Sequence, residues 1–110
     1  MMAFRVEITD PARDDIDEAV AFLAHHSQQA ARKWKIELQA LILSLQEMPG
    51  RFAVIPEATE LGMPYRSAPH HSHRVIFRIE ESNNTVYVVR VYHGARRPLS
   101  PEDIDPQDEN

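Results

Sequence analysis

The sequence contains no cysteine, little glycine and no long apolar run. Without cysteine no disulfide can form, which is typical of proteins that work in a reducing cytosol. The apolar segments are far shorter than the ~20 residues that a membrane-spanning helix needs, and the N-terminus has no signal-peptide pattern. We therefore expect a soluble, cytoplasmic protein that needs no membrane. It should fold as a single domain without disulfides or bound metal ions.

Charge is distributed unevenly along the chain. The formal net charge is −5, and five of the 17 acidic residues lie between 102 and 109. The segment 65–101 carries six arginines and four histidines against two acids. A basic C-terminal half on an acidic N-terminal half suggests two different partners. We predict one domain over 1–100 and an acidic, mobile tail over 101–110, whose deletion from residue 102 onward should leave the melting temperature nearly unchanged.

The first half of the chain predicts a strand followed by two helices. Apolar and polar residues alternate over 4–9, as in a half-buried strand. Asp10 and Pro11 then start a helix over 11–26, and Ser27 caps a second helix over 28–48. Both helices carry an apolar stripe at three-and-four spacing. The break between them is so short that they should fold back as an antiparallel pair.

The second half predicts a short strand and a β-hairpin. A connector that contains three prolines or glycines and several apolar anchors precedes a strand over 65–68. Two runs rich in β-branched and aromatic residues, 75–77 and 86–92, are separated by turn-forming residues at 81–84. The expected fold class is therefore α+β with the order β-α-α-β-β-β, in which an antiparallel sheet packs on the helix pair.

The register of this hairpin decides which side chains share a face. We predict Arg74 opposite Tyr92 and His73 opposite His93. This register gives one face that carries the arginines, with Arg74, Ile76, Arg78, Val88, Arg90 and Tyr92. The other face is apolar, with Val75, Phe77, Ile79, Tyr87, Val89 and Val91. The apolar face should pack on the helices and the arginine face should point outward.

The order of elements and three segments resemble the RelE/ParE superfamily of toxins from bacterial type II toxin–antitoxin modules. The segments are Tyr65-Arg66, Ser72 to Ile79 and Val91 to Arg97, and the closing His-Gly-Ala-Arg is most similar to the ParE or plasmid-stabilisation branch. The resemblance implies a growth inhibitor that a cognate antitoxin holds inactive in a hetero-oligomer. It implies no cofactor.

The resemblance leaves the target open. ParE-like members poison DNA gyrase without an agreed catalytic residue, whereas RelE-like members cleave messenger RNA on the ribosome. For a ribonuclease the resemblance implies Arg74 on the phosphate, His93 as acid–base group and Arg90 beside them. However, Gly94 stands where the relevant subgroup has a tyrosine, and a neutral body fits ribosomal RNA poorly. Gyrase is favoured, a ribonuclease is the alternative, and a non-toxic antitoxin-binding protein is a third reading.

Two sets of interaction residues follow from this reading. The expected target-binding residues are Arg74, Arg78, Arg90, Tyr92, Arg96 and Arg97, and the expected antitoxin-binding residues are Trp34, Leu38 and Arg66. The arginines could equally be a solvated face or the landing site of an acidic antitoxin segment. His70, His71 and His73 lack carboxylate or cysteine partners at ligand spacing, so no metal site is expected.

Overall fold

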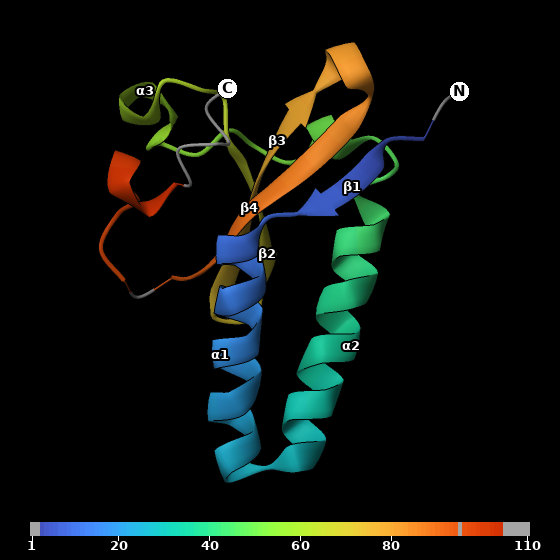
Figure 1. Ribbon diagram of the computed structural model, residues 1–110, viewed down its shortest axis with the longest axis vertical. Coiled ribbons are helices and arrows are strands. Elements are labelled where there is room, and N and C mark those ends of the chain that lie inside the picture. Colours follow the sequence, from blue (N-terminus) through green and yellow to red (C-terminus); the bar gives the residue numbers. More distant parts are fainter. Residues whose placement is uncertain (1–2, 95, 105–110) are drawn as a thin grey trace.

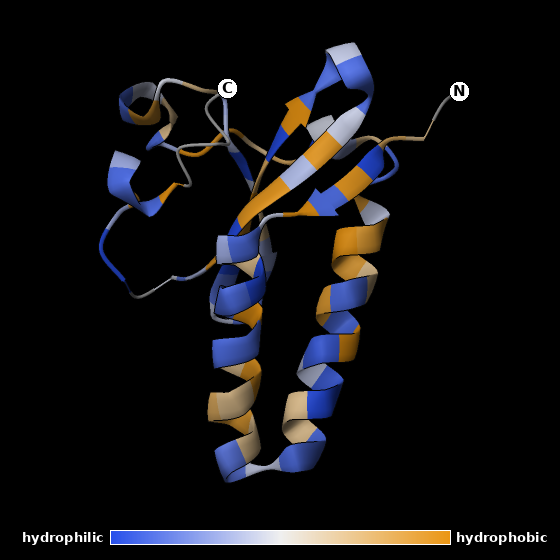
Figure 2. Cartoon of the chain, viewed as in Figure 1, coloured by the Kyte–Doolittle hydropathy of each residue, from blue (hydrophilic) through white to orange (hydrophobic). Residues whose placement is uncertain are grey.

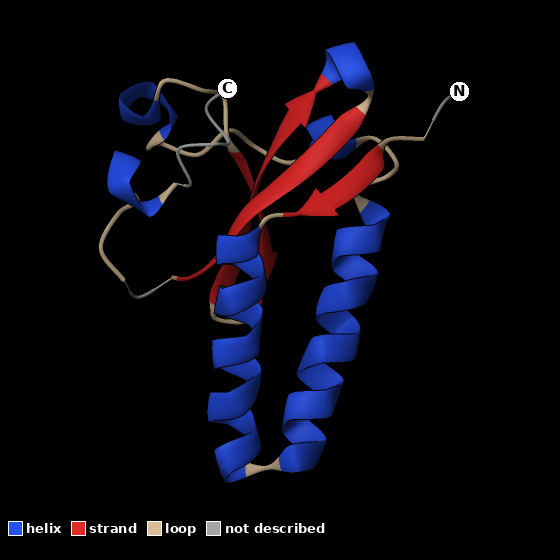
Figure 3. Cartoon of the chain, in the orientation of Figure 1, coloured by secondary structure: helices blue, strands red, loops and turns tan. Residues whose placement is uncertain are grey.

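The computed structural model describes residues 3–94 and 96–104, and it combines a helical hairpin with a four-stranded sheet (Figures 1 and 3). The strands are β1 (Arg5–Ile8), β2 (Arg66–His70), β3 (His73–Glu80) and β4 (Thr85–His93). The helices are α1 (Asp10–His26), α2 (Gln28–Ser44) and the short α3 (Ala58–Leu61), and three 3-10 turns cover Pro49–Arg51 (η1), Glu81–Asn83 (η2) and Pro101–Asp103 (η3). This order confirms the predicted α+β fold class.

The helical hairpin forms because one serine serves both helices. Ser27 ends α1 with its backbone N–H on Leu23 O, and its Oγ accepts a hydrogen bond from Ala30 N at 3.1 Å at the start of α2. The chain therefore reverses within a single residue, and the two helices run side by side (Figure 1). None of the helices in the described part of the chain is long and apolar enough to cross a membrane.

The sheet is mixed, which corrects the predicted antiparallel sheet. Its strand order is β1-β4-β3-β2, and β1 runs parallel to β4 while the other two pairs are antiparallel. Short turns force antiparallel pairing only between the strands that they join. β1 is separated from β4 by the helical hairpin and by β2 and β3, so no turn fixes their relative direction and the sequence pattern carried no signal for it.

The predicted hairpin register holds for only half of the β3–β4 pair. His73 lies opposite His93 and Arg74 opposite Tyr92, as predicted. Beyond Ile76 the register shifts by one residue, so that Phe77 pairs with Val88. This shift is a bulge in β4, and it exchanges the faces of three residues: Val88 joins the helix-facing core, whereas Tyr87 and Val89 turn to the other side of the sheet.

Apolar residues cover both faces of the sheet and form two cores. The first core lies between the sheet and the helices and contains Ala12, Ile16, Trp34, Leu38, Ile42, Leu45, Ala68, Val75, Phe77, Val86, Val88 and Val91. The second core lies on the opposite face and contains Ile55, Tyr65, Ile76, Val89, Tyr92, Leu99 and Ile104. Apolar and more polar residues alternate along β4, which contributes to both (Figure 2).

The C-terminal segment closes the second core, in contrast with the expected mobile tail. Leu99 is 1% exposed and Ile104 is 3% exposed, and η3 lies between them. η3 lies beside α3, away from the helical hairpin (Figure 1). The tail prediction is therefore wrong for residues 101–104, because two apolar side chains among prolines and acids suffice to hold the segment on an apolar sheet face. Residues 105–110 lie outside the described part.

Candidate functional site

The arginines of β3 and β4 do not form an open face, because carboxylates within the protein neutralise them. Arg74 Nη2 donates to Glu57 Oε2 at 2.7 Å. Arg78 is buried, and its Nη1 donates to Glu80 Oε1 at 3.0 Å. Arg90 forms a third pair. The sequence predicted the outward direction because arginine is usually solvated, but the second core covers this side of the sheet.

Arg90 forms the most enclosed of these ion pairs. Its Nε and Nη2 donate to Asp15 Oδ2 and Oδ1 at 2.7 and 2.8 Å, and its Nη1 donates to Asp103 O at 2.8 Å. Asp15 Oδ2 also accepts from Val91 N at 2.9 Å. The side chains of Arg90 and Asp15 are only 14% and 13% exposed. The hydrogen bond that Arg90 donates to the Asp15 carboxylate raises the pKa of Arg90, so the guanidinium keeps its charge.

Three arginines surround the ring of Tyr92. The guanidinium carbons of Arg74, Arg90 and Arg96 lie 5.9, 5.6 and 4.8 Å from the ring centre, within the range of cation–π attraction. The ring itself is buried, and the Tyr92 hydroxyl donates to Arg97 O at 3.0 Å. Tyr92 therefore contacts the arginines from inside the protein, and its own side chain is too buried to touch a target.

Asp103 fixes the loop that follows β4. Its two oxygens accept from Arg97 at 2.8 and 3.1 Å, and Oδ2 also accepts from Ser100 N at 2.9 Å. Burial acts to raise the pKa of Asp103, but Arg97 and the Ser100 N–H outweigh it and the pKa is lowered. Arg96 remains exposed, and within the described residues it has no carboxylate partner. Arg96 and Arg97 are thus the accessible members of the predicted target-binding set.

Glu57 joins the connector before β2 to the C-terminal segment. Its carboxylate accepts from Arg74 at 2.7 and 3.3 Å and from Leu99 N at 3.1 Å. The hydrogen bonds from Arg74 lower the pKa of Glu57 from 4.5 to about 2. One carboxylate therefore ties together β3 and both segments that cover the second core.

This lowered pKa predicts acid sensitivity. The folded state holds Glu57 ionised, so its stabilising effect is present above about pH 5 and is lost as the pH falls toward about 2. In Glu57→Gln the free energy of unfolding should be lower than in the wild type at pH 6, and the gap should shrink by pH 3. Urea unfolding at several pH values measures this. Glu60→Gln, on the exposed side of α3, is the control; a constant gap would contradict the assignment.

Four histidines gather around Trp34 where β2, β3 and β4 meet. The Trp34 ring lies 5.0 Å from His70 and 5.3 Å from His73. His93 lies 4.9 Å from His73, and His71 lies 4.7 Å from His70. Burial lowers the pKa of His70 and of His73, so both favour the neutral form near pH 7. No group of three or more metal-ligating residues in the described ranges could hold an ion.

The structure does not bring the predicted ribonuclease residues together. Arg74 pairs with Tyr92 on the face of the second core, whereas His93 pairs with His73 on the helix side. Successive side chains of a strand point to opposite faces, so Arg74 and His93 lie on different sides of the sheet. The third candidate, Arg90, is engaged by Asp15.

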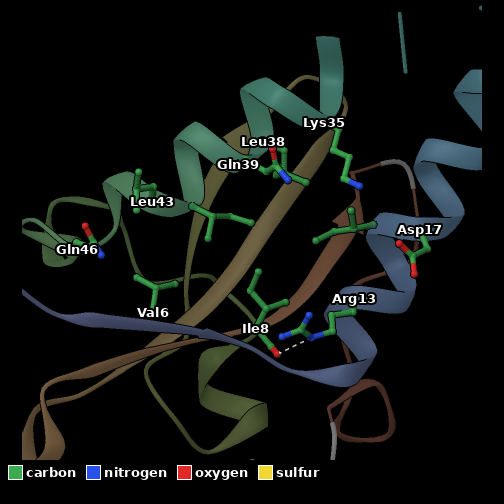
Figure 4. Close-up of a pocket in the computed structure, with 11 residues that line it drawn as sticks. Val6, Ile8, Arg13, Asp17, Lys35, Leu38, Gln39, Leu43 and Gln46 are labelled. Atoms are coloured by element: carbon green, nitrogen blue, oxygen red, sulfur yellow. Dashed lines mark hydrogen bonds between the residues drawn. The ribbon is translucent and has the colours of Figure 1, made fainter. Parts of the chain in front are cut away.

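Among the grooves in the described part of the chain, one pair is lined by residues of both α1 and α2. The first groove, of about 450 Å³, has an apolar floor made by Val6, Ile8, Ile16, Leu38 and Ile42. Lys35 on α2 and Asp17 on α1 lie on opposite sides of it, and Arg13 Nε donates to Ile8 O at 3.3 Å (Figure 4). Leu43, which is 60% exposed, lies at its rim.

The second groove, here called the histidine groove, is larger, at about 710 Å³. Ala19, Leu23, Trp34 and Val91 give it an apolar lining, and Phe22 is 65% exposed. Its polar members are Asp15, Glu18, His71, Ser72, His73, His93 and Arg96.

The predicted antitoxin-binding residues are not on one surface. Leu38 lies in the floor of the first groove, and Trp34 lines the histidine groove. Arg66 Nη1 donates to Phe52 O at 2.6 Å and so holds the connector. Phe22 and Leu43 were not among the predicted residues. Each is a large apolar residue outside the apolar stripe of its helix, so the sequence indicates that both are exposed, and each lines a groove.

Comparison with known families agrees with this architecture. A family model described as "ParE toxin of type II toxin-antitoxin system, parDE" matches residues 6–98. The chain belongs to the ParE toxin family. No curated protein matches it.

Two solved structures share the ParE-family fold. One is the toxin–antitoxin complex RelBE2 from Mycobacterium tuberculosis, with a TM-score of 0.59 and 20% identity, over 83% of this chain and 98% of that chain. The other is the chromosomal ParDE toxin–antitoxin system from P. aeruginosa, with a TM-score of 0.64 and 14% identity, over 83% of this chain and 96% of that chain. At these identities the likeness shows the fold alone. Together with the family match it identifies a type II toxin of the RelE/ParE superfamily.

Proposed function

We propose that this ParE-family toxin inhibits DNA gyrase in the cytoplasm by binding to it, not by catalysis. The observation that carries the proposal is the engagement of Arg74 and Arg90 by Glu57 and Asp15. A ribonuclease needs free cations for the charge that builds on the phosphate. Removing Arg90 from its carboxylate would cost about 3 to 5 kcal/mol, as for other buried pairs, so this site is poorly prepared for phosphate.

A supercoiling assay with purified toxin and gyrase tests the proposal. Inhibition should saturate near one toxin per gyrase binding site, because a binder does not turn over. Full gyrase activity in an excess of toxin would reject it. Primer extension on messenger RNA from cells that make the toxin is the complementary measurement. Codon-phased cuts that disappear in Arg74→Ala would establish the ribonuclease instead, and unimpaired growth without antitoxin would establish the non-toxic alternative.

The first groove is the proposed site of the cognate antitoxin. An apolar floor between two charged helices suits an amphipathic helix, whose apolar stripe enters the groove while its polar flanks meet Lys35 and Asp17. The proposal is supported by the two solved structures of similar fold, which are a toxin–antitoxin complex and a toxin–antitoxin system. The cognate antitoxin would be the small acidic protein encoded by the adjacent reading frame.

Leu43→Glu should weaken antitoxin binding at least about tenfold, because it places a charge at the apolar rim without opening a cavity. Ile36→Glu is the matched control, since Ile36 is on the same helix, is 58% exposed and lines neither groove. Isothermal titration calorimetry with the adjacent gene product measures both. Equal affinities for the two variants would place the antitoxin elsewhere.

A further inference from the structure

The histidine groove and the first groove lie on opposite sides of α1. At about 3.6 residues per turn, Arg13, Ile16 and Asp17 point to one side of α1, into the first groove. Glu18 and Phe22 point to the other side. The two grooves have no lining residue in common. One partner can therefore fill the first groove without touching the second.

The histidine groove has the composition of a protein-binding surface. Its lining combines Trp34, Leu23 and Val91 with Phe22, which is 65% exposed. An exposed phenyl ring at the edge of an apolar groove is available for contact with a partner. Aromatic residues that become buried on binding contribute most of the energy of many protein interfaces. An apolar side chain from a partner would bury Phe22 and the groove lining together.

The charges around this groove set the chemistry of the partner. Arg96 is exposed and lines the groove just beyond the end of β4, and its guanidinium carbon lies 4.8 Å from the centre of the Tyr92 ring. His93, also exposed, lies on the same wall. On the opposite wall Asp15 is already engaged by Arg90 and Val91 N, so Glu18 is the remaining carboxylate of the lining. A carboxylate of the partner would pair with Arg96.

Nucleic acid fits this groove poorly. Phosphate binding requires several cations along the backbone, and the lining contains one arginine, Arg96, together with the carboxylate of Glu18. The apolar lining would remain uncovered by a phosphate backbone. The combination of apolar residues, one arginine and one carboxylate fits a protein segment that carries a large apolar residue beside an acid.

We propose that the histidine groove, and not the arginine-bearing sheet face, is the surface with which this toxin binds its target protein. The inference rests on the proposed inhibition of gyrase and adds the surface that performs it. The antitoxin, in the first groove, would then act from the opposite side of α1.

Phe22→Glu tests the inference in the supercoiling assay with purified gyrase. The concentration of toxin needed for half inhibition should rise at least about tenfold, and Arg96→Glu should change it in the same direction. Ile36→Glu, an equal change outside both grooves, should inhibit like the wild type. Thermal unfolding and antitoxin binding confirm that the variants are folded, since Phe22 and Arg96 are exposed and contribute to neither core.

The outcomes separate this inference from the proposed function. If the wild type does not inhibit gyrase, the proposed function fails and the inference fails with it. If the wild type inhibits and Phe22→Glu inhibits equally, the inference alone is overturned. Loss of antitoxin binding with unchanged inhibition in Phe22→Glu would also overturn it, because the groove would then belong to the antitoxin.

Discussion

Asp15→Ala should lower the free energy of unfolding by about 3 to 5 kcal/mol, the usual cost of leaving one charge of a buried pair without its partner. Asp15 holds Arg90 through two hydrogen bonds, at 2.7 and 2.8 Å, and it also accepts from Val91 N. The substitution would leave the guanidinium inside the fold with only the Asp103 interactions. For a domain of this size such a loss is a large part of the total stability.

Urea unfolding of three variants makes this prediction specific. Asp14→Ala, an exposed neighbour on α1, is the matched control and should change the stability little. The double variant Asp15→Ala with Arg90→Leu should recover much of the loss, because it removes both charges. A cost below about 1 kcal/mol for Asp15→Ala, the range of surface ion pairs, would show that water replaces the carboxylate.

The ion pairs also explain why the sequence predicted the position of the arginines but not their environment. Their assignment to two neighbouring strands followed from the β-branched runs, which are local patterns. Arg74 and Arg90 have distant partners, because Glu57 lies in a connector, Asp15 in α1 and Asp103 in the C-terminal segment. No local pattern specifies which distant carboxylate meets which arginine, so the sequence alone favoured solvated side chains.

The bulge in β4 is a second feature that local patterns could not give. β1 pairs with β4 only as far as Val88, and Thr9 then donates through its Oγ to the carbonyls of Val88 and Val89, both at 3.1 Å. The register shift occurs at this point, where β1 leaves the sheet and α1 begins. The pairing of His73 with His93 was predicted correctly, and so were the apolar stripes of the two helices up to Ser44. The predicted second helix over 28–48 is too long, because α2 ends at Ser44 and Met48 is 67% exposed.

The grooves also combine features that local sequence patterns predict with features that depend on distant contacts. Apolar periodicity placed Trp34 and Leu38 correctly on the inner side of α2. It could not show that they line different grooves, because that depends on where α1 lies against the sheet. Phe22 and Leu43 are exposed apolar residues of α1 and α2, and their proposed roles depend on the groove beside each, which no local pattern specifies.

Deleting residues 102–110 should lower the free energy of unfolding by at least about 2 to 5 kcal/mol, the cost of removing one large buried aliphatic side chain. The deletion removes Ile104, which is 3% exposed in the second core, and Asp103, which binds Arg90 and Arg97. It would also release the end that holds Leu99 against the sheet. This reverses the expectation from composition, in which the acidic segment contributes nothing to stability.

A shorter deletion, of residues 105–110, provides the control for this experiment. It removes three of the five acids of the segment but keeps Asp103 and Ile104, so the melting temperature should stay near that of the full chain. Ile104→Ala alone should produce much of the loss seen in the longer deletion. If both deletions leave the melting temperature unchanged, the connector with Ile55 and Tyr65 would be sufficient to cover the second face of the sheet.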